Sequence, residues 1–166
     1  MKIFAYGSNM SHNRLKKRVP SAIKISNGFV KGYTLNCSKI SRKDGSGKAT
    51  LNATGSNEEL VWGVIYEIDE NEKPMLDSAE GLNNGYNETM IEVSDGQEVH
   101  KTQIYLADKG YVNEELKPYE WYKAYMIEGA KENDLPKDYI TKLDSLDANK
   151  DQNDERREKE MKILKG

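Results

Sequence analysis

The order of hydrophobic and polar residues divides this chain into a strand-rich first two thirds and a helical last third. Alternating or short apolar runs predict β-strands at 2–6, at two places within 22–38, and at 49–53, 60–68, 86–93 and 98–106. Glycine, asparagine and serine separate these runs and indicate turns. Two short helices are expected among the strands, at 12–19 and 72–80.

Beyond Pro118 the apolar residues change to helical spacing. Large side chains recur every three or four positions, at Trp121, Tyr122, Tyr125, Met126 and Ala130, and again at Tyr139, Leu143 and Leu146. Strands and helices are segregated, which argues against a doubly wound parallel sheet. The predicted fold class is α+β: a curled or closed mixed β-sheet, that is a small β-barrel, with surrounding helices and a helical C-terminal third.

The end of the chain differs in composition from the rest. Charged residues dominate 148–166, so we divide the chain into a domain at 1–147 and a charged C-terminal tail at 148–166, either a solvated helix or a frayed end. The stretch 147–158 has the acidic spacing of a calcium-binding loop, but Gln152 stands where such a loop needs glycine. A solvated acidic linker is the preferred interpretation.

Length and charge exclude several classes of function. The 166 residues suit one domain, and 25 basic against 28 acidic residues give a net charge of −3, so nucleic acid is not an expected partner. No segment approaches the about 20 apolar residues of a membrane span. A single cysteine, Cys37, and the lack of a signal peptide indicate a soluble, cytoplasmic protein. His12 and His100 are too few and too separated for a metal cluster.

The first segment that could carry chemistry is Tyr6-Gly7-Ser8-Asn9. Glycine after a buried strand permits a tight turn in which successive amide N–H groups face one concavity, and such a concavity binds anionic oxygen. The N-terminal donors of the following helix favour a carboxylate or a developing oxyanion at the same place. From these four residues alone, a plain turn capped by Ser8 or Asn9 is the simpler interpretation.

The second segment runs from Leu76 to Gly81 and contains Glu80. This glutamate falls in the last turn of a predicted helix that Gly81 ends, where the helix dipole disfavours negative charge. Burial there would raise the pKa of the carboxyl group toward the range of a general acid or base. Most glutamates of so charged a chain lie on the surface, so position alone favours an ordinary surface residue.

The two segments together, in this order, resemble the γ-glutamylcyclotransferase family, which includes AIG2-like proteins. The family has a YGSN loop after the first strand and an LDxxEG segment near mid-chain, and these match residues 6–9 and 76–81. Further similar segments are 18–20, 32–35, 61–66 and 129–136. The resemblance therefore identifies residues 1–147 as a γ-glutamylcyclotransferase-like domain.

The resemblance implies an intramolecular reaction. The α-amino nitrogen of a γ-glutamyl amine attacks the γ-carbonyl carbon, which forms 5-oxoproline and releases the amine without a metal or an organic cofactor. By the same resemblance Glu80 is the general acid and base. The amides of Gly7, Ser8 and Asn9 would hold the α-carboxylate of the substrate or the tetrahedral oxyanion.

The resemblance leaves several points open. Tyr6, Tyr86 and Tyr119 are candidate substrate-binding residues, and packing in the core explains each of them equally well. The expected partner is a small-molecule γ-glutamyl substrate, and homodimer formation is left open. One alternative is a cyclotransferase that removes a γ-glutamyl group from a biosynthetic intermediate, and another is a binding module without turnover. Glutathione-specific relatives usually carry leucine where Asn9 stands, which disfavours glutathione as the substrate.

Overall fold

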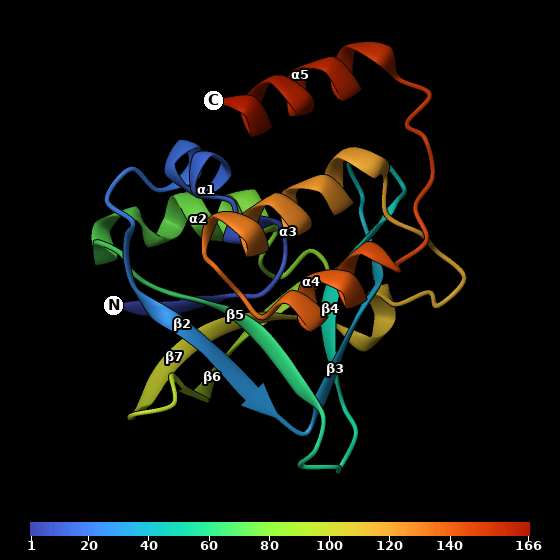
Figure 1. The fold of residues 1–166 in the computed structure, drawn as a ribbon. Helices are drawn as coiled ribbons and strands as arrows, with labels where there is room; N and C mark the ends of the chain where they lie inside the picture. Colours follow the sequence, from blue (N-terminus) through green and yellow to red (C-terminus); the bar gives the residue numbers. More distant parts are fainter.

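A computed structural model describes all of the residues 1–166, and its centre is a closed β-barrel (Figure 1). The five barrel strands follow the order β1-β5-β2-β6-β7 and comprise β1 (Lys2–Ala5), β2 (Ile23–Lys31), β5 (Leu60–Glu67), β6 (Tyr86–Ser94) and β7 (Val99–Ala107). β1 closes the barrel because it pairs antiparallel with β5 and parallel with β7, where Ile3 lies opposite Gln103. The predicted closed mixed barrel is confirmed.

Two further strands stand apart from the barrel. β3 (Tyr33–Ile40) and β4 (Gly47–Ala53) form a separate antiparallel sheet with an irregularity between Asn36 and Lys39. The sequence pattern predicts both strands but does not indicate that they leave the barrel. The side of β4 facing the barrel lies against β7, where the Ala107 amide donates to Thr50 Oγ1 at 3.0 Å.

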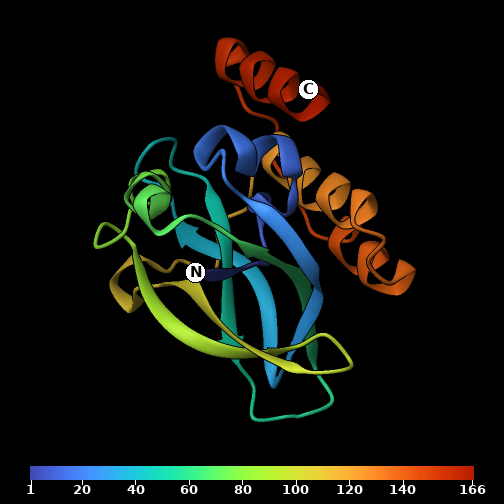
Figure 2. The same ribbon diagram turned by 90° about the vertical axis from the view of Figure 1, so that its left-hand side faces the viewer.

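Helices cover one end of the barrel (Figures 1 and 2). The α-helices are α1 (His12–Arg18), α2 (Lys73–Glu80), α3 (Glu120–Glu132), α4 (Lys137–Asp144) and α5 (Asp154–Lys165), and the 3-10 turns are η1 (Ser8–Met10), η2 (Glu70–Glu72) and η3 (Lys109–Tyr111). Both helices expected among the strands and the helical C-terminal third are confirmed. The structure contains no helix with the length and apolar character needed to cross a membrane.

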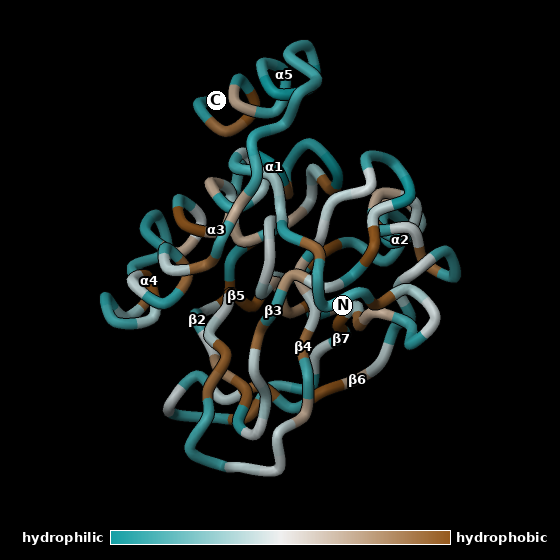
Figure 3. Tube along the Cα trace, turned by 90° about the vertical axis from the view of Figure 1, so that its right-hand side faces the viewer, coloured by the Kyte–Doolittle hydropathy of each residue, from teal (hydrophilic) through white to brown (hydrophobic).

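The apolar core joins the barrel interior to α3. Hydrophobic positions concentrate on the strands and on the inner side of α3, whereas α5 is largely hydrophilic (Figure 3). The helical spacing seen beyond Pro118 marks the buried face of α3: Trp121, Tyr125, Met126 and Ala130 are each at most 3% exposed. This burial stabilises the attachment of α3 to the barrel, because apolar area removed from water stabilises a fold by about 25 cal/mol per Å².

The turn after β1 is held from behind by α3. Gly129 of α3 packs directly on the chain at 10–11: a Cβ atom at Gly129 would lie 2.5 Å from the Ser11 nitrogen and 2.6 Å from the Met10 carbonyl carbon. Asn133 Nδ2 donates to the Met10 carbonyl oxygen at 3.1 Å, and the Tyr66 hydroxyl donates to the same oxygen at 3.2 Å. α3 with its C-cap residue and β5 therefore set the position of this turn.

A buried carboxylate anchors the beginning of the C-terminal segment to the body. Asp151 is 0% exposed and accepts two hydrogen bonds of 2.6 Å from the Arg156 guanidinium and one of 2.8 Å from Trp121 Nε1. The interpretation of 147–158 as a solvated linker is thus wrong at Asp151, because its charge is paired inside the fold. α5 itself has no buried residue and lies across α1 and α3.

Acid should weaken this attachment. The hydrogen bonds from Arg156 hold the pKa of Asp151 well below the usual value of about 3.9, and the Trp121 N–H acts in the same direction. A carboxylate with a lowered folded-state pKa stabilises the fold above its unfolded-state pKa, and this contribution is lost as the pH falls through the folded-state value. We therefore expect Asp151→Asn to be less stable than the wild type near neutral pH, with a difference that shrinks below about pH 4.

Thermal unfolding followed by circular dichroism at a series of pH values measures this difference in Tm. Asp147→Asn is the matched control, because the Asp147 side chain is 80% exposed. A Tm difference between wild type and Asp151→Asn that stays constant down to the lowest pH would contradict the prediction.

Candidate active site

Glu80 is the last residue of α2, and the local sequence explains its position. Gly81 adopts a left-handed conformation with φ of +74° and donates its N–H to the Asp77 carbonyl at 2.9 Å, which ends the helix. The side chain of Glu80 is 15% exposed and points to the turn after β1. The carboxylate therefore lies largely shielded from water at the helix C-terminus, where the backbone does not stabilise negative charge.

Two polar side chains compensate that charge. Arg18, the last residue of α1, forms an ion pair with Glu80 Oε1, and Asn9 Nδ2 donates to the same oxygen at 2.9 Å. Asn9 Oδ1 in turn accepts from Arg18 at 2.8 Å, so the three side chains form a closed cluster. The Glu80 carboxylate therefore has a charged partner and a neutral hydrogen-bond donor within the site.

Arg18 is the charged site residue that sequence reasoning missed; Tyr122 of the crevice was not predicted either. Arg18 belongs to one of the segments that resemble the family, but no spacing rule connects it to a glutamate 62 positions later. The available signal is weak: Arg18 is one of three consecutive basic residues, and the helix dipole alone accounts for them. Only the packing of α1 beside α2 distinguishes it from Lys16 and Lys17.

The predicted anion-binding turn is present as a backbone feature. Within it, Met10 donates to the Gly7 carbonyl at 3.1 Å and Ser11 donates to the Ser8 carbonyl at 3.2 Å. These turn hydrogen bonds use neither the Gly7, the Ser8 nor the Asn9 amide as a donor, so those donors are available to an anion. No side chain caps η1 or α1, and the Asn9 amide group bonds Glu80 and Arg18 instead, which disfavours the plain capped-turn interpretation.

Aromatic side chains enclose the small crevice between the turn and Glu80. Tyr6, Tyr86 and Tyr122 line it and are at most 6% exposed. The Tyr6 hydroxyl donates to the Tyr105 carbonyl, and the Tyr86 hydroxyl donates to the Ala49 carbonyl at 2.6 Å. Burial raises the pKa of Tyr6 and of Tyr86 well above 10, so both remain neutral donors.

The structure brings together all of the predicted site residues except Tyr119. Its hydroxyl donates to the Asp44 carbonyl at 3.3 Å, and its ring packs near Trp121 and under the Arg156 guanidinium. Tyr119 lines neither the crevice nor the cavity beside it. Its place in the fold is the contact between the β3–β4 loop and the C-terminal segment.

The crevice opens into a larger cavity of about 590 Å³. The two share Ser8, Glu80, Tyr86 and Tyr122, so the carboxylate lies at their boundary. A volume of this size is within the range of small-molecule sites. The arrangement can hold one polar anionic group in the crevice and a second, larger group in the cavity, with Glu80 between them.

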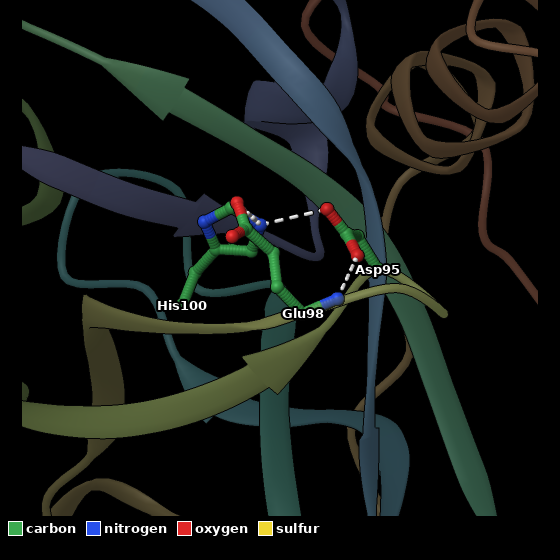
Figure 4. A group of neighbouring side chains, drawn as sticks. All are labelled: Asp95, Glu98 and His100. Atoms are coloured by element: carbon green, nitrogen blue, oxygen red, sulfur yellow. Dashed lines mark hydrogen bonds and ion pairs between the residues drawn. The ribbon is translucent and has the colours of Figure 1, made fainter.

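A second polar cluster lies at the opposite end of the β6–β7 hairpin (Figure 4). There Asp95, Glu98 and His100 bring three potential metal-ligand atoms within 4.8 Å of one another, which the sequence analysis did not expect. The Lys2 ammonium lies 3.0 Å from His100 Nδ1 and can only donate, so Nε2 carries the proton that bonds Asp95 at 2.7 Å. The Glu98 amide and His100 both lower the pKa of Asp95. These hydrogen bonds stabilise the turn between β6 and β7. Because His100 Nε2 carries a proton, it has no lone pair with which to bind a metal ion.

A shielded carboxylate, free turn amides and an adjoining cavity on a closed barrel define a small-molecule enzyme of the α+β barrel class. Comparison with known proteins agrees: the AIG2-like family matches residues 60–143. γ-Glutamylcyclotransferases of Bos taurus and Homo sapiens are 31% and 29% identical over 153 residues, which cover 88% of this chain and 78% of each relative. A solved γ-glutamyl cyclotransferase superposes with a TM-score of 0.86 at 29% identity, covering 100% of this chain and 99% of that one. The chain belongs to the AIG2-like γ-glutamylcyclotransferase family.

Proposed function

We propose that this protein is a γ-glutamylcyclotransferase that releases 5-oxoproline from γ-glutamyl amines, with Glu80 as the general acid and base. The observation that carries the proposal is the Asn9, Arg18 and Glu80 cluster, which joins the anion-binding turn to a shielded carboxylate. Family membership supplies the class of reaction, and the cluster supplies the group that moves protons.

The reaction needs no nucleophile from the protein. Glu80 accepts a proton from the α-ammonium group of the substrate, and the freed amine attacks the γ-carbonyl carbon to form the ring C–N bond. In the tetrahedral intermediate Glu80 passes this proton to the leaving nitrogen, and the C–N bond to the leaving amine breaks. The ring nitrogen then loses its second proton to the restored Glu80 carboxylate, which releases it to solvent. Because both reacting groups belong to one molecule, the protein contributes mainly by holding the substrate in a folded conformation.

Each part of the site has a distinct task in this scheme. Arg18 and Asn9 hold the Glu80 carboxylate in place at the edge of the crevice, where it can accept a proton from the substrate. The amides of Gly7, Ser8 and Asn9 bind the α-carboxylate or the oxyanion. Tyr6 and Tyr86 line the crevice that encloses the γ-glutamyl part of the substrate. The leaving amine occupies the larger cavity.

A substrate panel tests the proposal. We expect the wild-type protein to form 5-oxoproline from γ-glutamyl amino acids such as γ-glutamyl-alanine, and not from the α-linked isomer α-glutamyl-alanine, which has no leaving amine on its γ-carbon. γ-Glutamyl-ε-lysine and glutathione complete the panel. Binding of γ-linked compounds without formation of 5-oxoproline would overturn the proposal in favour of a binding module. If the protein forms 5-oxoproline only from a γ-glutamyl amine larger than these compounds, the biosynthetic alternative is favoured.

Location and assembly are part of the same proposal. The single cysteine, Cys37, is buried and unpaired, which fits a reducing compartment such as the cytoplasm. Homodimer formation remains a prediction, and the partner that the site supports is a small molecule.

A further inference from the structure

The cavity beside Glu80 has a strong excess of positive charge. Its lining contains nine lysines and arginines but only three carboxylates, Asp44, Glu80 and Glu160, although the whole chain has a net charge of −3. A cleft lined by one sign of charge concentrates ligands of the opposite sign. The cavity therefore favours an anionic ligand.

Carboxylates neutralise only four of these nine basic groups. The ion pairs are Arg14 with Glu160, Arg18 with Glu80, Lys48 with Asp44, and Arg156 with Asp151. The five basic side chains without an ion pair are Lys17, Lys39, Arg42, Lys43 and Lys159. They come from α1, from β3 and the loop after it, and from α5, so elements distant in sequence converge on one cavity.

Lys39 is the most informative of the five. The residue is 6% exposed, yet its Nζ atom forms no ion pair or hydrogen bond and lies 4.5 Å from the centre of the Tyr86 ring. Gly85 leaves the space for it, because a Cβ atom there would lie 2.8 Å from Lys39 Cε. Burial lowers the pKa of the ammonium group, and the Glu80 carboxylate acts in the opposite direction. An ammonium group on a cavity wall without a carboxylate partner is free to form a charge-assisted hydrogen bond with an anionic ligand.

The C-terminal helix contributes to the same wall. Lys159 of α5 lines the cavity, and the neighbouring Glu160 accepts hydrogen bonds from Arg14 at 2.6 Å and from the Tyr125 hydroxyl at 2.9 Å. These contacts, together with the buried Asp151, hold α5 over α1 and α3. The charged tail thus forms part of the site that receives the leaving group.

We infer that the preferred substrates are γ-glutamyl compounds whose leaving amine carries two carboxylates, as an acidic amino acid does, and that Lys39 binds one of them. The inference rests on the proposed function, because that function assigns the cavity to the leaving group. Every amino acid leaving group brings one carboxylate, and five unpaired basic side chains exceed what that single charge requires. The basic side chains that remain without a partner would therefore favour a leaving group with a second carboxylate.

Two substrates of nearly equal shape test the inference. γ-Glutamyl-glutamate and γ-glutamyl-glutamine differ by one carboxylate, which is a carboxamide in the second compound. We expect kcat/KM for the glutamate compound to be about tenfold higher or more, since a hydrogen-bonded charge pair is commonly worth that factor. Raising NaCl to about 0.5 M should reduce the ratio, because salt screens the exposed members of the cluster.

Substitutions identify the residues responsible. Lys39→Met should bring the ratio of the two kcat/KM values close to one, mainly through KM for the glutamate compound, and Lys39→Arg should retain most of the preference. The double change Lys17→Gln with Lys43→Gln alters only exposed side chains and should lower the ratio without affecting folding. Lys101→Met is the matched control, since Lys101 is an exposed lysine of β7 outside the cavity.

The outcomes separate this inference from the proposed function. Equal kcat/KM values, or a preference for the glutamine compound, would overturn the inference and leave the proposed function intact. Faster turnover of γ-glutamyl-O-phosphoserine than of γ-glutamyl-glutamate would overturn the choice of a carboxylate. If neither compound yields 5-oxoproline while γ-glutamyl-alanine does, the inference fails and the proposed function stands. If no γ-glutamyl compound yields it, the proposed function fails, and calorimetry still decides: tighter binding of the glutamate compound supports the inference, and equal binding overturns it.

Discussion

Replacing Glu80 with glutamine is expected to lower kcat for 5-oxoproline formation by about 10²–10⁴-fold, the usual contribution of a positioned general acid or base. Glutamine has nearly the same shape as glutamate and can accept the hydrogen bonds from Asn9 and Arg18 through its oxygen atom. It cannot accept and return a proton. The loss should therefore appear in kcat, measured as 5-oxoproline release, while substrate binding measured by calorimetry persists.

Glu70→Gln provides the matched control for this experiment. Glu70 is an exposed residue of η2 that forms no side-chain hydrogen bond, and its replacement should leave kcat unchanged. Undiminished activity in Glu80→Gln would show that another group moves the protons. Loss of activity together with loss of substrate binding would assign Glu80 to binding rather than to proton transfer.

The second large effect is expected at Gly129, far from the carboxylate in sequence. In an ordinary exposed helix, alanine in place of glycine stabilises by about 1 kcal/mol. Here the added methyl group would collide with the backbone at Met10 and Ser11. Because the collision is with backbone atoms of a tightly packed region, we expect Gly129→Ala to lower the free energy of unfolding by about 1–3 kcal/mol, the cost of overpacking.

The same substitution should also reduce activity, because the turn that it displaces contains the proposed anion-binding amides. Urea denaturation gives the change in stability, and kcat/KM measured well below the unfolding transition gives the change in activity. Lys131→Ala, an exposed change two residues further along α3, is the control and should alter neither by much. Increased stability of Gly129→Ala would contradict the close approach of α3 to the turn.

Local patterns were sufficient for most of the fold. The apolar run at 60–68 predicts β5, the glycine after Glu80 predicts the end of α2, and the three-to-four spacing beyond Pro118 predicts the buried face of α3. These features depend on residues close together in the chain, whose periodicity is set by strand and helix geometry. The motif at 6–9 was found in the same way, since a glycine turn after a buried strand has a recognisable sequence.

Other features had no local signal. The ion pair of Arg18 with Glu80, the burial of Asp151 and the displacement of Tyr119 from the cavity all depend on which elements lie side by side. The departure of β3 and β4 from the barrel is of the same kind, because a strand pattern does not specify which strand it pairs with. Charge pairing across 62 residues leaves no periodic trace in the sequence.

The sequence by itself determined the α+β class, the order of strands and helices, and the two motifs that mark the family, because each depends on residues close together in the chain. Only the tertiary structure decided that Asn9, Arg18 and Glu80 meet, and that five unpaired basic groups from α1, β3, the following loop and α5 surround one cavity. The physical reason is that electrostatic interactions act through space and fall with distance, so their strength follows the fold and not the order of the chain.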